Sequence, residues 1–512
     1  MSEVVVPGDG LRKWLSATLI HNGRLGALRV SPLPLKYLWL LAPVAYVALL
    51  GVAIAHHEPW ADEAQAWLLA RDSNPVTLLK DYLPYEGTPG LWHLLLMVPA
   101  KLLPYKTLNV ISGALAALAT YLVLRYSPFP LILKVILPFT YFLFFQYGVV
   151  ARSYALLAPL LFLVAIKYQE RLQKPWLHAG LLFLLGNVSA HGYLISGALM
   201  LLNGLHLVNE WPELNPPLRK KNVTAIATYG VMMALVALTL RPPPNRTGAI
   251  NWPEASGGPL AFWREGGNML TDSMTNSLLI LLPVLAISLW FLWRRKVLAL
   301  YLLPTFWIIV FSTYIYQAVW HRGTLFIIWI FAIWVGLQQY QEKDKQDSSS
   351  RLLVLAALVL VCVVQIPWTV GSLRSDFSHA YSGSKAAARY IKAHSLDKGV
   401  LWATGFSSVA ILPYFEENIF DNYHKGLKPS FWLWSDSNDM VQDSKAVEGV
   451  RPDHVVLSIK VPNAEQFMVL YPSYRVREKF PGSLFWKEVE VETEEFLLLQ
   501  RRGPRVPSTA RE

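Results

Sequence analysis

Twelve apolar runs separated by short polar segments fill most of the first 370 residues. Most runs approach the roughly 20 residues that an α-helix needs to cross the hydrocarbon core of a bilayer. The pattern therefore predicts an all-α polytopic membrane domain over residues 35–370, with about 11–13 transmembrane helices. The runs lie at about 35–55, 91–103, 107–124, 129–149, 153–168, 176–190, 193–209, 222–240, 274–293, 297–316, 322–340 and 351–369.

Positive charges between the runs predict how the chain is oriented. Four basic clusters and the polar, basic segment 1–34 fall on one side, which the positive-inside rule identifies as the cytoplasm. Segments 56–90 and 241–273 then become external loops, and the chain after residue 370 also lies outside. Twelve crossings would return the chain to the cytoplasm, so an odd number is required, and we expect the miscount among the short runs within 91–150. The clusters are Lys167–Lys174, Arg219–Lys221, Arg294–Lys296 and Lys343–Lys345.

Composition supports this class of protein. The chain is 54% hydrophobic with a mean hydropathy of +0.33, which excludes an ordinary soluble globular protein. The net charge of +11 would suit nucleic acid, but Lys and Arg occur in short clusters between apolar runs, which is typical of contacts with lipid head groups. Cys362 is the only cysteine, so a disulfide framework and a cysteine metal site are excluded.

The composition changes after residue 370, where helical and strand patterns alternate. This alternation predicts an external α/β domain over 371–502, followed by a tail at 503–512. Helices are expected at Ser384–His394, Ser407–Phe415 and Ala464–Leu470. Strands are expected at Gly399–Ala403, His454–Ser458, Tyr474–Phe480, Phe485–Val491 and Phe496–Gln500.

The loop after the first run, 56–90, concentrates carboxylates close to a hydrocarbon boundary. Charged groups are costly at that depth, so they suggest an active site at the membrane surface. Residues 60–71 have the spacing of a short amphipathic helix in the interface, with Glu63 beside the tryptophan stripe and Asp62 on another side. The loop ends in a Pro and Gly turn that carries Tyr85 and Glu86.

Each of these residues also has a structural explanation. Asp62 and Glu63 could form the solvated side of an interfacial helix. Glu86 could favour the start of the following helix through its dipole. His191 could be a hydrogen-bonded structural histidine, and Arg152 could extend its guanidinium to the interface.

The order of four motifs resembles the GT-C class of integral-membrane glycosyltransferases, in the branch of the bacterial aminoarabinose transferases and protein O-mannosyltransferases. The motifs are Asp62-Glu63 after the first span, the turn Tyr85-Glu86-Gly87-Thr88-Pro89-Gly90, Ala151-Arg152-Ser153-Tyr154, and Trp320-His321-Arg322. Gly87 and Thr88 depart from the Pro and Lys of the family turn. The matching Glu binds a metal in some relatives, so the resemblance leaves open whether Glu86 holds a divalent metal, and no cofactor is certain.

The resemblance implies that a sugar is transferred, with inversion, from a polyprenyl-phosphate-linked donor at the outer face of a bacterial inner membrane. The acceptor stays open between lipid, glycan and protein. Asp62 would be the general base, and Glu63 would tune it or bind the acceptor. Arg152, His321 and Arg322 would bind the donor phosphate. The substrate would also contact Tyr85, Glu86, Tyr154 and His191.

Two other functions fit the same composition. A transporter or flippase of a lipid-linked glycan would also need a polytopic domain, although such proteins usually carry two equivalent halves. Here the carboxylates are concentrated in one loop and no internal repeat is visible. A membrane scaffold with a partner-binding external domain is the third possibility.

Overall fold

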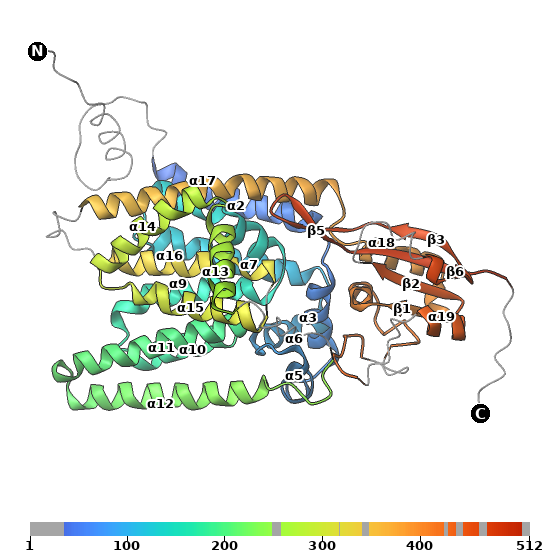
Figure 1. Cartoon of the computed structure of the whole chain (residues 1–512), viewed down its shortest axis with the longest axis horizontal. Helices are drawn as coiled ribbons and strands as arrows, with labels where there is room; N and C mark the ends of the chain where they lie inside the picture. The colour runs from blue at the N-terminus through green and yellow to red at the C-terminus, as the bar shows by residue number, and fades with distance from the viewer. Residues whose placement is uncertain are drawn as a thin grey trace, which may run out of the picture.

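The computed structural model describes residues 35–247, 258–316, 318–339, 348–423, 429–436, 444–459 and 468–503. It is mostly helical, with a bundle of long apolar helices at one side and a small domain containing β-sheet at the other (Figure 1). The predicted cytoplasmic segment 1–34 and almost all of the predicted tail lie outside the described residues.

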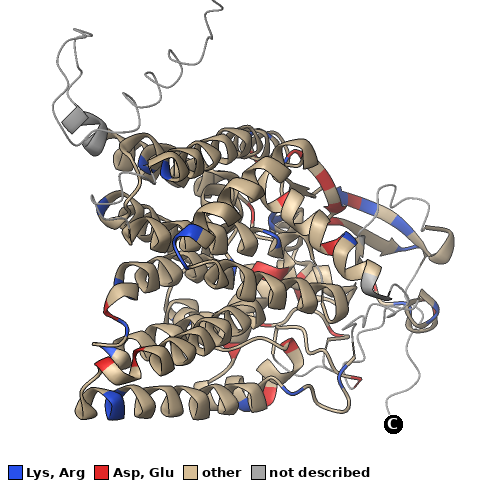
Figure 2. Cartoon of the chain, turned by 60° about the vertical axis from the view of Figure 1, so that its left-hand side comes forward, with Lys and Arg blue, Asp and Glu red and all other residues tan. Residues whose placement is uncertain are grey.

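The bundle consists of helices that follow the predicted apolar runs. In Figure 2 the middle parts of these helices are mostly tan, and the blue Lys and Arg and red Asp and Glu lie mostly near the helix ends. The members are α2 (Leu35–His56), α7 (Thr107–Tyr126), α8 with η2 and η3 (Leu131–Ile136, Leu137–Phe139, Phe142–Val149), α9 (Leu157–Lys167), α10 (Pro175–Gly186), α11 (Ala190–Glu210), α12 (Pro216–Thr239), α14 (Leu278–Arg294), α15 (Ala299–Tyr314), α16 (Gly323–Gln338) and α17 (Ser348–Ser378).

Five helices of the described chain are long and apolar enough to cross a membrane, or up to eight if each sharply bent pair counts as one span. In one such pair, α2 is followed at a bend of 89° by α3 (Ala61–Asp72). The helix predicted at 60–71 is therefore confirmed, and it lies across the end of the bundle. Short elements α4 (Pro75–Thr77), η1 (Leu78–Tyr82) and α5 (Leu83–Glu86) complete the loop 56–90.

Polar contacts identify which helix termini lie together. His57, just after α2, bonds Asp376 near the end of α17, and Asn109 at the start of α7 bonds the backbone of Val149 at the end of η3. We call this end of the bundle, next to the C-terminal domain, the domain end. The described basic clusters lie in the connections at the opposite end, because α9, α11 and α14 start at the domain end and run away from it.

The segment at 91–103 is the run that does not cross the bundle. It forms α6 (Leu91–Leu102), which packs against α3. The amide of Leu91 donates to Asn187, just after α10, and the Lys101 ammonium donates to the carbonyl of Ser73, just after α3. Both ends of α6 thus lie at the domain end. The remaining eleven segments pass between the two ends in alternation, an odd number.

The segment 241–273 was expected to be an external loop, but its second half is a helix. Residues Gly258–Met274 form α13, which meets α14 at a bend of 89°. Its apolar residues follow a helical spacing that the Pro-rich first half of the segment obscured. The first half is described only up to residue 247.

The C-terminal domain begins after α17, which continues to Ser378, past the predicted boundary at residue 370. It contains a four-stranded sheet in the order β1-β2-β6-β3, with β1 parallel to β2 and the other pairs antiparallel. The strands are β1 (Leu401–Thr404), β2 (His454–Ile459), β3 (Tyr474–Phe480) and β6 (Glu495–Arg501), and the helical elements are α18 (Ser384–Ala393), η10 (Leu396–Lys398), η11 (Phe406–Tyr414) and α19 (Ser444–Val450).

Most elements predicted for this domain are confirmed, with two exceptions. The single strand expected at Phe485–Val491 is instead a hairpin of β4 (Ser483–Trp486) and β5 (Val489–Thr493), because Lys487 turns the backbone at a φ of 60°. The helix expected at Ala464–Leu470 lies largely outside the described residues.

The hairpin turn anchors the domain to the bundle. The buried Lys487 ammonium donates to the carbonyl of Asp272 at 2.7 Å and lies 3.9 Å from the ring centre of Trp368. One hydrophobic core accordingly continues from the bundle into the sheet and η11.

Candidate functional site

Helix α3 carries the acidic pair into two different environments. Successive side chains on a helix are rotated by about 100°, so neighbours in sequence face different neighbours in space. Asp62 lines a cavity of about 490 Å³ at the domain end, and so does Gln65, one turn later. Glu63 is fully buried and is not among the lining residues. The two adjacent acids therefore have different surroundings.

Asp62 forms an ion pair with Arg152 inside the cavity. The distance from Oδ2 to Nη2 is 2.9 Å, and the two side chains are 28% and 18% exposed. The Arg152 guanidinium also lies 5.5 Å from the ring centre of Trp60 and 5.8 Å from that of Tyr154, so two aromatic rings hold its plane. The sequence motifs around residues 62 and 152, 90 positions apart, thus meet at one point.

Two histidines complete the polar wall beside Arg152. The Tyr154 hydroxyl and His191 Nδ1 are 3.3 Å apart, and the rings of His191 and His321 are 4.5 Å apart between centres. Within the described chain, Arg152 Nη1, His191 Nε2 and His321 Nδ1 are buried without a hydrogen-bond partner. Buried polar groups normally have partners, so these three atoms indicate a place for a polar ligand.

Glu86 and Arg246 belong to a second part of the cavity. Gln65 Nε2 donates to Glu86 Oε1 at 2.7 Å, and Arg246 lies beside Gly87, whose added Cβ would be 3.6 Å from the guanidinium. Burial raises the pKa of Glu86 to about 7, and the hydrogen bond from Gln65 offsets only part of that effect. This carboxyl group therefore changes charge near neutral pH.

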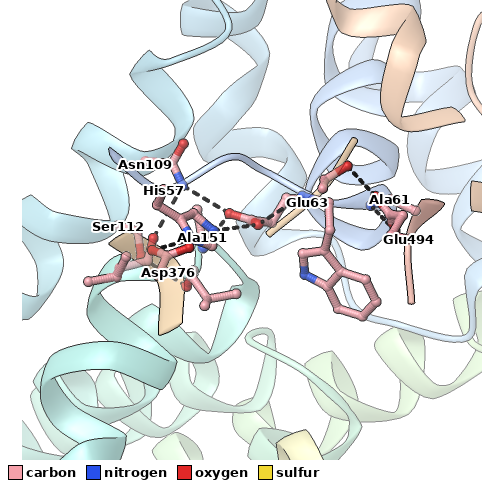
Figure 3. Close-up of polar contacts among 12 residues, drawn as sticks. His57, Ala61, Glu63, Asn109, Ser112, Ala151, Asp376 and Glu494 are labelled. Atoms are coloured by element: carbon pink, nitrogen blue, oxygen red, sulfur yellow. Dashed lines mark hydrogen bonds and ion pairs between the residues drawn. The ribbon is translucent and has the colours of Figure 1, made fainter. Parts of the chain in front are cut away.

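Glu63 joins α3 to three other parts of the chain (Figure 3). Its Oε1 accepts from Asn109 Nδ2 at 2.9 Å and from the amide of Ala151 at 2.7 Å. Its Oε2 accepts from the amide of Trp60 at 3.2 Å, as in a capping box, and lies 3.1 Å from His57 Nε2. Because Ala151 precedes Arg152, this carboxylate fixes the Asp62 helix relative to the Arg152 backbone.

The pair between Glu63 and His57 is ionised. Burial alone would lower the pKa of His57, but the charges and hydrogen bonds of Asp376 and Glu63 outweigh it and raise this pKa to about 9. Burial alone would raise the pKa of Glu63, but His57 and the donating amides lower it. On the other side of α3, Glu494 of the C-terminal domain accepts from the amide of Ala61 at 3.1 Å, which places a carboxylate at the helix N-terminus.

The structure brings together six of the nine predicted site residues. Asp62, Glu86, Arg152, Tyr154, His191 and His321 all line the cavity. The other three do not line it. Glu63 is buried in the contacts above, Tyr85 donates to Asn245 Oδ1 at 2.9 Å, and Arg322 pairs with Asp272 and Glu265.

The expectation that Arg322 joins Arg152 at one phosphate is therefore corrected. Its guanidinium is only 13% exposed, and its two terminal nitrogens pair with two carboxylates of α13. These acids lie in the segment that was predicted to be an external loop, so the partners of Arg322 could not be identified from the sequence. Direct contact of Glu63 with the acceptor is corrected in the same way, because this side chain is enclosed.

Sequence reasoning missed several lining residues, among them Gln65, Arg246, Phe406 and Trp434. Gln65 could have been found, because it lies one helical turn after Asp62. Arg246 lies in the segment 241–273 that was predicted to be an external loop. Phe406 and Trp434 come from the C-terminal domain, and nothing in their local sequence indicates a distant cavity.

The described residues contain no group of three or more His, Cys, Asp or Glu side chains placed to hold a metal ion. Asp62 faces Arg152, and Glu86 accepts from Gln65. A carboxylate pair engaged in this way does not offer the ligand set that a divalent cation requires. The metal role considered for Glu86 stays a prediction, and no chemical step below involves a metal.

Comparison of the chain with protein-family models, with curated proteins and with solved structures gave no match. The functional assignment therefore depends on the geometry of the cavity.

Proposed function

We propose that the chain is an integral-membrane glycosyltransferase of the GT-C type, which transfers a sugar from a polyprenyl-phosphate-linked donor to an acceptor at the outer face. One observation carries the proposal. A carboxylate and a guanidinium, Asp62 and Arg152, are paired at 2.9 Å in a cavity at the end of an apolar helical bundle. The same cavity is lined by Arg152, His191 and His321, each of which has a buried polar atom without a partner among the described residues.

The path of the chain supports a membrane orientation. After eleven alternating passes, the chain leaves the bundle at the end opposite to the one where it entered. The described basic clusters lie at the end of the bundle away from the cavity. With these clusters in the cytoplasm, the cavity and the α/β domain face outward. In a bacterial inner membrane, that side is the periplasm.

The cavity wall offers separate places for the two ends of such a donor. Arg152, His191 and His321 provide donors for a phosphate, which a guanidinium binds through charge-assisted hydrogen bonds. Phe311 and Ile315, at the end of α15, form an apolar part of the wall. A polyprenyl chain would leave the cavity along this apolar side and continue between lipid-facing helices.

The proposed reaction is a single displacement. The acceptor hydroxyl oxygen attacks the anomeric carbon, and its proton passes to the Asp62 carboxylate. The bond from the anomeric carbon to the phosphate oxygen breaks, and the polyprenyl phosphate leaves with that electron pair. Negative charge thus grows on the phosphate during the step, and Arg152 stabilises it more strongly in the transition state than in the bound donor.

The test compares Asp62→Asn with Asp81→Asn, an exposed carboxylate of the same loop, in intact membrane vesicles. Removal of a general base lowers a rate by about 10²–10⁴-fold, so we expect at least a hundredfold loss of sugar transfer for Asp62→Asn. Protein level and donor binding should persist, and Asp81→Asn should behave as the wild type. Wild-type transfer by Asp62→Asn would overturn the mechanism, and movement of an unconsumed lipid-linked sugar across the bilayer would indicate a flippase.

A further inference from the structure

A second part of the cavity is built jointly by the bundle and the C-terminal domain. We call it the aromatic subsite and define it as Gln65, Glu86, Arg246, Phe406 and Trp434. Of these five residues, the donor chemistry above uses none. Their arrangement therefore needs its own explanation.

The aromatic subsite is held together by paired backbone and side-chain groups. Gln65 Nε2 donates to the carbonyl of Trp432 at 2.7 Å, and the amide of Trp432 donates back to Gln65 Oε1 at 2.8 Å. The amide of Thr247 donates to the carbonyl of Trp434 at 3.1 Å. Segment 429–436 is thus fixed to α3 on one side and to the chain after α12 on the other.

Flat apolar and polar groups lie next to each other in this subsite. The rings of Phe406 and Trp434 are 5.0 Å apart between centres, and both side chains are only half-buried, so part of their surface faces the cavity. Arg246 Nε is buried without a partner within the described residues. The Glu86 carboxyl group adds an acceptor, or a donor when it is protonated.

We propose that the aromatic subsite binds a pyranose ring of the sugar acceptor. A pyranose presents C–H groups on one face, which suit the electron-rich face of an indole, and hydroxyls around its edge, which suit Arg246 and Glu86. This inference rests on the proposed function, which it extends by giving the acceptor a chemical class.

A peptide acceptor fits the subsite less well. Extended peptides are usually recognised through free backbone groups at a strand edge. Here the amide and carbonyl of Trp432 are used by Gln65, the carbonyl of Trp434 is used by Thr247, and the carbonyl of Asn245 accepts from Asp436. The polar groups that Arg246 and Glu86 present to the cavity belong to side chains, and both can bond to the hydroxyls of a sugar.

The position of Asp62 assigns the ring to the acceptor rather than to the donor. Asp62 pairs with Arg152, which is proposed to bind the donor phosphate. The charge of Asp62 also acts on Glu86 of the aromatic subsite. A base for the acceptor hydroxyl must lie between the donor and the acceptor, and Asp62 occupies that place.

The binding test uses the full-length protein in detergent and saturation-transfer difference NMR. The probes are methyl α-mannopyranoside, methyl β-glucopyranoside and methyl β-galactopyranoside, with a hexapeptide containing serine and threonine as the competing class. We expect at least one glycoside to receive saturation at its C–H protons. Its affinity should fall about tenfold in Trp434→Ala and Arg246→Gln and recover in Trp434→Phe. Trp176→Ala, an exposed tryptophan at the other end of the bundle, is the matched control.

The outcomes separate this inference from the proposed function, because glycoside binding is measured without sugar transfer and should survive Asp62→Asn. Binding of the peptide but of no glycoside would overturn the inference, as would glycoside binding that Trp434→Ala and Arg246→Gln leave unchanged. Displacement of the glycoside by undecaprenyl-phosphate-mannose would also overturn it, since the ring would then occupy the place of the donor sugar.

Discussion

The substitution Glu63→Gln removes one charge from a buried network while preserving the shape of the side chain. The carboxylate accepts from four groups, and a carboxamide can accept at only one of its two terminal atoms. Its NH₂ group would face donors in either orientation. At one terminal atom these are Asn109 Nδ2 and the amide of Ala151, and at the other they are the amide of Trp60 and His57 Nε2. At least one buried donor would lose its partner. Protonated His57 would keep only one carboxylate partner, Asp376.

The expected cost follows from the burial of both partners. Glu63 and His57 are fully buried, and removal of one member of a buried ion pair typically costs about 3–5 kcal/mol. The matched control is Glu170→Gln, the same chemical change in an exposed acid that pairs with Lys167 and Lys174. Surface pairs contribute little to stability, so this variant should remain close to the wild type.

The measurement is the free energy of unfolding in mixed detergent and dodecyl sulfate micelles, as a function of pH. The pKa of His57 is raised from 6.5 to about 9 in the folded protein, so its stabilisation is complete below pH 6.5 and is lost as the pH rises through 9. That shift corresponds to about 3 kcal/mol, and Glu63→Gln should remove most of this pH dependence. If Glu63→Gln were no more destabilising than Glu170→Gln, the inference that Glu63 fixes α3 to the neighbouring segments would be refuted.

Three further predictions address other parts of the chain. Glu86→Gln should stabilise the protein at pH 8 by up to about 3 kcal/mol and have no effect below pH 4.5, because a folded-state pKa of about 7 means that ionisation of this half-buried acid opposes folding. Equal stability of both proteins at pH 8 would contradict this. Gly323→Ala should lower the melting temperature, because the new Cβ would overlap a phenylalanine ring and a tyrosine hydroxyl, whereas Gly180→Ala, with open space around it, should not. In closed vesicles, a membrane-impermeant maleimide should label Lys80→Cys and Leu103→Cys from the same side, because α6 does not cross the bundle; labelling from opposite sides would show that it does.

The apolar pattern alone predicts most of the bundle. Every predicted apolar run contains a helix, because a run of this length can satisfy its backbone without water only as a helix. The run at 91–103 shows the limit of that reasoning. Its composition resembles a short span, but Lys101 and Leu91 both bond to groups at the domain end. Only the distribution of charges on the two sides indicated that the runs around 91–150 were miscounted.

The site was predictable where function depends on local sequence. The acidic pair at 62–63 and the basic residue Arg152 could be picked out because charges are costly beside apolar runs. Their separation into a cavity residue and a buried residue follows from helical rotation. The partners of Glu63 outside α3 come from three other parts of the chain, at His57, Asn109 and Ala151. Arg322 was predicted to lie beside Arg152, but it pairs with acids on α13. This helix was not predicted, because the segment before it is rich in proline.

The C-terminal domain helps to build the cavity from two directions. Glu494 accepts from the amide of Ala61 at the start of α3, and Trp432 is held by Gln65 one turn beyond Asp62. The helix that carries the proposed base is thus fixed at its start by a carboxylate and along its side by a backbone segment of the same domain. Loss of the domain would free both contacts and remove Trp434 from the wall. The domain should therefore influence the reactivity of Asp62 as well as the choice of acceptor, and neither role requires it to contact the donor.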